Sequence, residues 1–89
     1  MGHSRIINEV GEVTSITYPA HGSSTYLDVI ISPRDNDGNA KENLLLRFLG
    51  RRTMACLEIG SLVRVHGTRS FLAGTPIVFN PAITVMAGQ

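Results

Sequence analysis

Two strand-like segments lie in the middle of this chain: Tyr26-Leu27-Asp28-Val29-Ile30-Ile31-Ser32 and Asn43-Leu44-Leu45-Leu46-Arg47-Phe48-Leu49. In both stretches the side chains alternate with the period of two that is typical of a half-buried strand. The alternation predicts six inward side chains: Leu27, Val29, Ile31, Leu44, Leu46 and Phe48. The connection between the stretches, residues 33–41, is rich in Pro, Asp, Asn and Gly. We therefore predict a hairpin.

Three further strands are predicted around this hairpin. Residues 5–17 are rich in β-branched side chains, and Gly11 within them permits a bend or bulge by which one long strand serves two parts of a sheet. Residues 61–69 alternate again, and residues 76–86 close the chain. Because proline cannot donate to a ladder, we expect the last strand to be broken, or to lie at an edge, at Pro81.

The segment between the third and fourth predicted strands, residues 50–58, is long enough for about two helical turns. A short helix is predicted there. Five strands with one short helix between the third and the fourth is the element order of the OB-fold, a five-stranded Greek-key barrel. We therefore predict an all-β OB-fold barrel. A chain of 89 residues with 43% hydrophobic side chains fits a single domain, which we place at residues 5–87.

Composition and charge argue against a membrane-spanning or secreted protein. No apolar run approaches the roughly 18 to 20 residues that cross a bilayer, and the N-terminus lacks the regions of a signal peptide. The lone cysteine, Cys56, cannot form an intramolecular disulfide. A cytoplasmic protein without membrane contact is expected. Residues 1–42 carry three basic and six acidic side chains, whereas residues 43–89 carry five and one, so the second half is the expected contact for a polyanion.

Four short motifs in the second half of the chain point to a family. They are residues 47–52 (RFLGRR), 57–60 (LEIG), 62–67 (LVRVHG) and 79–81 (FNP). Together they resemble the tRNA-anticodon-type OB-fold family, and most closely small actinobacterial OB-fold proteins and the wedge domain of branch-migrating recombination helicases. The similarity spans roughly residues 42–86. It implies an OB-fold that binds single-stranded or junction nucleic acid and has no catalytic activity of its own.

The sequence contains no group of residues with the spacing of a catalytic or metal-binding motif. The glycines build neither a phosphate-binding loop nor a dinucleotide signature. His21, His66 and Cys56 lack the spacing of metal ligands, and Cys56 is interpreted as a small core side chain. Asp35 and Asp37 are interpreted as turn-forming residues rather than a cation site. We therefore expect no catalytic residue, no metal and no cofactor.

The expected ligand surface is the face of the second and third strands with its flanking loops, because OB-folds bind oligonucleotides there. Single-strand binding needs aromatic faces for base stacking and basic groups for phosphate. Phe48 and Phe79 are assigned to the core. The candidate binding residues are Tyr18, Tyr26, Arg47, Arg51, Arg52, Arg69 and Phe71. The expected partner is single-stranded DNA or RNA.

The same face admits a different function. Ile30, Leu45 and Leu49 are apolar and predicted to point outward, and an exposed apolar patch commonly marks a protein interface. Arg47 among them suits either function, because arginine is common at protein interfaces and at phosphates. The alternative is therefore a module that docks a protein partner or forms a homodimer through this face.

Overall fold

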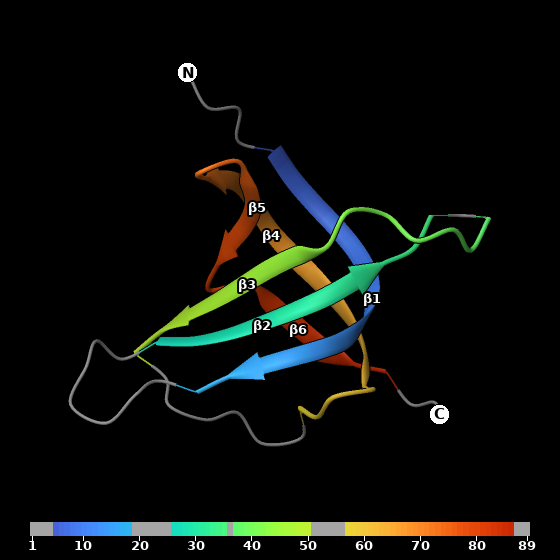
Figure 1. Ribbon diagram of the computed structural model, residues 1–89, viewed down its shortest axis with the longest axis horizontal. Coiled ribbons are helices and arrows are strands. Elements are labelled where there is room, and N and C mark those ends of the chain that lie inside the picture. Colours follow the sequence, from blue (N-terminus) through green and yellow to red (C-terminus); the bar gives the residue numbers. More distant parts are fainter. Residues whose placement is uncertain (1–4, 19–25, 36, 51–56, 87–89) are drawn as a thin grey trace.

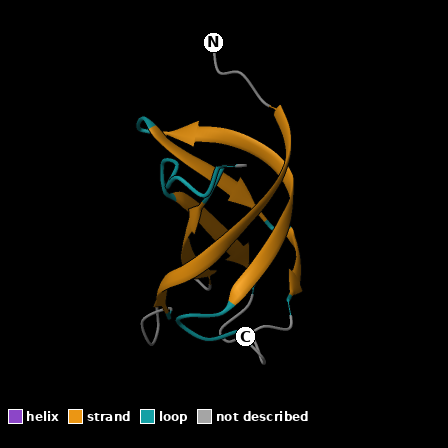
Figure 2. Cartoon of the chain, turned by 90° about the vertical axis from the view of Figure 1, so that its right-hand side faces the viewer, coloured by secondary structure: helices purple, strands orange, loops and turns teal. Residues whose placement is uncertain are grey.

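The fold consists of strands and loops throughout the part of the chain that the computed structural model describes, residues 5–18, 26–35, 37–50 and 57–86 (Figure 2). The strands are β1 (Arg5–Thr17), β2 (Tyr26–Pro33), β3 (Leu44–Leu49), β4 (Leu62–Leu72), β5 (Thr75–Phe79) and β6 (Ala82–Val85). These ranges contain no helix, and so none that could span a membrane. The all-β class predicted from the alternation is confirmed.

The predicted short helix over residues 50–58 falls mainly on residues 51–56, which lie outside the described residues. The flanking residues are described, and they are not helical. Gly50 is in a turn, and Leu57 and Glu58 have no regular secondary structure. Of the predicted helical segment, the described residues Gly50, Leu57 and Glu58 are therefore not part of a helix.

Five of the strands pair into a closed ring (Figure 1). The first half of β1 is antiparallel to β4, and its second half is antiparallel to β2. β3 is antiparallel to β2, which confirms the predicted hairpin, and β3 is also parallel to β5. β5 is antiparallel to β4, which closes the circuit, and β6 lies beside β4 as a sixth strand.

Gly11 lies where β1 changes partners. It pairs with Val63 of β4 and also with Pro33 of β2. A Cβ atom at this position would lie 2.8 Å from the carbonyl oxygen of Ser32, so only glycine allows the two backbones to approach this closely. The predicted role of Gly11 in letting one strand serve two partners is confirmed. The register shift itself comes two to four residues later, between Val13 and Ser15.

The closing strand is split in two, so the sheet has six strands rather than the five predicted. The pairing of β4 with β5 and that of β4 with β6 differ in register by one residue, which is the signature of a bulge. The break falls at Asn80 and Pro81, as the missing N–H of proline predicts. Asn80 has a φ of 50° and bonds to the end of β3: its N–H donates to the Arg47 carbonyl, and its Oδ1 accepts from the Leu49 N–H, both at 2.8 Å.

The hydrophobic core fills the ring. All six side chains that the alternation placed inward on β2 and β3 are buried, and Phe48 keeps only 2% of its surface exposed. Ile7 and Val13 of β1, Val63 and Val65 of β4 and Val78 of β5 pack against them. Because these side chains face the core, the side chains between them on β2 and β3 face the outer surface of the ring.

Candidate nucleic-acid interface

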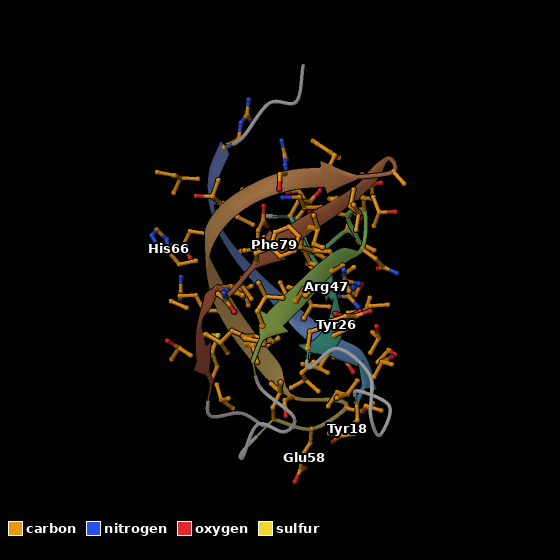
Figure 3. The ribbon with its side chains drawn as sticks, turned by 90° about the vertical axis from the view of Figure 1, so that its left-hand side faces the viewer. Tyr18, Tyr26, Arg47, Glu58, His66 and Phe79 are labelled. Atoms are coloured by element: carbon orange, nitrogen blue, oxygen red, sulfur yellow. The ribbon has the colours of Figure 1, made fainter. Side chains whose placement is uncertain are left out.

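The outer face of β2, β3 and β5 brings one acidic, one basic and one aromatic side chain into a row. Asp28 pairs with Arg47 across β2 and β3, and Arg47 pairs with Phe79 across β3 and β5. Tyr26 lies two residues before Asp28 on the same face of β2. Figure 3 shows Tyr26, Arg47 and Phe79 across this face. We call Tyr26, Asp28, Arg47, Leu49 and Phe79 the outer-face cluster.

Arg47 is held from two sides. Its Nε and Nη2 donate to the two carboxylate oxygens of Asp28 at 2.9 and 3.0 Å, and its guanidinium carbon lies 4.2 Å from the centre of the Tyr26 ring. The two charged side chains keep 21% and 18% of their surface exposed. The hydrogen bond from Arg47 to Asp28 raises the pKa of Arg47 above its usual value. Arg47 is thus a fixed, charge-balanced planar group beside an aromatic ring.

Phe79 belongs to this face and not to the core. The sequence assigned it to the core, and that assignment is wrong, because 44% of its surface is exposed. Ile77 and Val78 are both fully buried, so alternation along this strand does not reveal the side of Phe79, and the register that pairs Phe79 with Arg47 places it outside. Leu49, 50% exposed, lies at the end of β3 on the same face.

The remaining predicted binding residues are not gathered on this face. Tyr18 is exposed just after the end of β1. Arg69 pairs with Val78, whose side chain points into the ring, so Arg69 lies on the opposite side of the sheet from Arg47. Phe71 lies two residues further along β4, and its ring centre is 5.0 Å from the Arg69 guanidinium carbon. Arg51 and Arg52 fall outside the described residues.

Other candidate residues have structural or solvent-facing positions. Asp35 Oδ1 accepts hydrogen bonds from the N–H groups of Asp37 and Asn39, both at 2.9 Å, which confirms a turn-forming role for Asp35. The bond from Asn39 lowers the pKa of the Asp35 carboxyl. His66 is exposed on β4, away from Tyr26 and Arg47 (Figure 3). Within the described ranges no three His, Cys, Asp or Glu side chains are grouped to hold a metal ion.

Comparisons of this chain with protein-family models, with curated proteins and with solved structures each gave no match. The described residues form a small all-β domain whose strands close into a ring, with a mixed aromatic and charged cluster on its outer face.

Proposed function

We propose that this chain is an OB-fold module that binds single-stranded nucleic acid without catalysing a reaction. The strand arrangement supports the fold: β1, β2 and β3 form a meander, β5 returns parallel to β3, and β4 closes the ring against β1. A five-stranded Greek-key barrel of this kind binds oligonucleotides on the face of its second and third strands. The outer-face cluster occupies that face.

The proposal rests on three members of the outer-face cluster, the rings of Tyr26 and Phe79 and the guanidinium of Arg47. Unstacked bases bind on aromatic rings and on guanidinium planes, and such stacking tolerates any base. Phe79 offers a ring with 44% of its surface exposed, and Arg47 offers a guanidinium whose plane is fixed by Asp28 and Tyr26. The cluster therefore suits stacking of two or three neighbouring bases with little base specificity.

The charge of the cluster shapes the expected binding. Asp28 balances the charge of Arg47, so the face offers little net attraction to phosphate. Each phosphate neutralised by a single-strand-binding protein contributes about −0.7 to the slope of log affinity against log salt concentration. We therefore expect modest affinity, with stacking as the main contribution and a salt slope no steeper than that of about one phosphate contact.

The same cluster supports a second candidate function, docking of a protein or of a second copy of the chain. Leu49 and Phe79 expose apolar surface side by side with the neutralised Arg47. Protein interfaces favour aromatic residues and arginine and are depleted in unbalanced charge. Protein docking depends on the apolar area that Phe79 and Leu49 expose, whereas base stacking depends on the flat ring of Phe79.

The test is fluorescence anisotropy with labelled oligothymidine and oligouridine, together with a sizing run at several protein concentrations. Phe79→Ala should weaken oligonucleotide binding about 5- to 150-fold, the range for loss of one stacked base. Phe79→Leu keeps the apolar character and loses the flat ring, so it should also weaken binding. Leu72→Ala is the matched control, because Leu72 is 46% exposed and lies at the far end of β4.

Two results would favour the second candidate. One is a wild-type protein that binds neither oligonucleotide. The other is concentration-dependent self-association that Phe79→Ala abolishes and Phe79→Leu retains.

A further inference from the structure

Two arginines lie side by side on the inner side of the sheet, at the end of the ring where β1 begins. Arg5 of β1 and Arg69 of β4 are direct partners in the antiparallel pair. Directly opposite residues project from the same face, with Cβ atoms about 4.5 to 5.5 Å apart, and like charges in that position repel. Among the described residues neither arginine has a carboxylate within ion-pair distance. The fold therefore keeps an uncompensated pair of positive charges together.

Arg69 is also held in place with part of its hydrogen-bonding capacity unused. Its guanidinium carbon lies 5.0 Å from the centre of the Phe71 ring. Its Nε is buried, with no hydrogen-bond partner in the described part of the chain. A buried donor without a partner is uncommon in folded proteins, and it adds to the spare hydrogen-bonding capacity of the Arg69 guanidinium.

Arg69 lines a hollow of about 160 Å³ at this end of the ring, whereas Arg5 is not among the residues that line it and lies beside Arg69 on the neighbouring strand. Ile7, Leu44 and Pro76 form its apolar wall. Two carboxylates also line it, but Glu9 is already paired with Lys41, whose Nζ donates to both of its oxygens at 3.0 and 2.9 Å. Glu42, the second carboxylate, is exposed and makes no ion pair with Arg69. With the Glu9–Lys41 pair neutral, Arg5 and Arg69 outweigh Glu42, so the net charge of these five residues is +1.

We propose that this hollow binds a phosphate group, with Arg69 as the principal ligand and Arg5 as the second positive charge. The guanidinium fork of arginine donates two parallel N–H bonds to phosphate oxygens, and on Arg69 these come from Nη1 and Nη2, because the buried Nε has no surface open to the hollow. The net positive charge favours an anion, and the planar fork of Arg69 matches the oxygens of a phosphate monoester or of inorganic phosphate. The site lies on the opposite side of the sheet from the outer-face cluster and does not depend on the proposed stacking function.

The first test measures the melting temperature in sodium phosphate and in sodium chloride of equal ionic strength. Phosphate should raise the melting temperature of the wild type by about 4 °C or more once its concentration exceeds the dissociation constant several-fold. Arg69→Gln should abolish the shift, and Arg5→Gln, which alters an exposed side chain, should reduce it. Arg64→Gln is the matched control, because Arg64 lies on β4 and faces outward, on the other side of the sheet from Arg69. An absent shift, or one that persists in Arg69→Gln, would overturn the proposal.

The second test identifies the source of the phosphate group. If it is the end of a nucleic-acid strand, 5′-phosphorylated oligothymidine should bind the wild type more tightly than the unphosphorylated strand, and Arg69→Gln should remove the difference. Equal affinity of the two strands, with the phosphate-dependent melting shift retained, assigns the site to a free phosphate compound. Phe79→Ala should keep the melting shift, so failure of the stacking function and failure of this site are separate results.

Discussion

Arg47 donates two parallel hydrogen bonds to Asp28 across β2 and β3, at 2.9 and 3.0 Å, and stacks its guanidinium on Tyr26. This relationship gives the outer-face cluster a rigid plane while cancelling its charge. Arginine is well suited to this role, because its planar fork matches a carboxylate bidentately and still presents a face for stacking. Asp28 therefore controls both the position and the effective charge of Arg47.

Replacement of Asp28 by Asn should turn the balanced pair into a net positive group. The side chain keeps its shape and can still accept a hydrogen bond from Arg47, but the charge of Arg47 becomes available to phosphate. We expect oligothymidine affinity at low salt to rise about two- to fivefold and the salt slope to steepen by about 0.7. Glu12→Gln, which removes an exposed negative charge from β1, is the control and should change neither quantity to this extent.

Replacement of Arg47 by Ala should lower stability as well as binding, because it leaves a partly buried Asp28 carboxylate without its partner. The expected loss is about 1 to 3 kcal/mol of unfolding free energy, measured by urea denaturation. The double variant Asp28→Ala/Arg47→Ala should recover part of that loss, since it removes both charges. Additive losses in this cycle would show that the pair contributes no coupling energy.

Gly67 should tolerate no larger residue while Val78 is present. A Cβ atom at Gly67 would lie 2.8 Å from Cγ1 of Val78, inside the packed ring. We expect Gly67→Ala to cost about 1 to 3 kcal/mol of unfolding free energy through overpacking. Adding Val78→Ala removes the clashing methyl group, so the double variant should be less destabilised than the sum of the two single variants. Wild-type melting of Gly67→Ala would contradict the close packing of β4 against β5.

The turn between β4 and β5 offers a stabilising substitution. Ala73 and Gly74 have φ values of 52° and 84°, the pattern of a two-residue hairpin turn with both central residues left-handed. Alanine is disfavoured in that region, whereas asparagine adopts it readily. Ala73→Asn should therefore raise the unfolding free energy by up to about 1 kcal/mol in urea denaturation. A decrease would mean that the turn has a different conformation in solution.

The strands of this fold are predictable from local pattern, and the site is less so. Alternation correctly placed Leu27, Leu46 and Phe48 inside, because burial of one face imposes a period of two on the sequence. The pairing of Asp28 with Arg47 depends on the register of two strands separated by a long connection, which local pattern does not define. Placement of Phe79 outside depends likewise on the register that pairs it with Arg47, because Ile77 and Val78 before it are both buried.

Tyr18, Arg69 and Phe71 show a second limit of sequence-based prediction. The OB-fold prediction includes them because the loops between the first and second strands and between the fourth and fifth strands frame the ligand face of that fold. β4, however, continues to Leu72, beyond the predicted end at residue 69, so Arg69 and Phe71 are strand residues that pair with Val78 and Pro76. The period of two that places Val63 and Val65 inside also directs Arg69 inward, whereas the continuation of β4 through Phe71 is set by its pairing with β5.

A two-dimensional ¹⁵N–¹H NMR titration of the labelled protein with unlabelled oligothymidine shows which residues contact the strand. Binding at the outer-face cluster should progressively shift the backbone amides of Tyr26, Asp28, Arg47 and Phe79 and the Arg47 Nε–H signal, with little change at Asn8 and His66 on the other side of the ring. An unchanged spectrum, or shifts confined to residues outside the outer-face cluster, would contradict it.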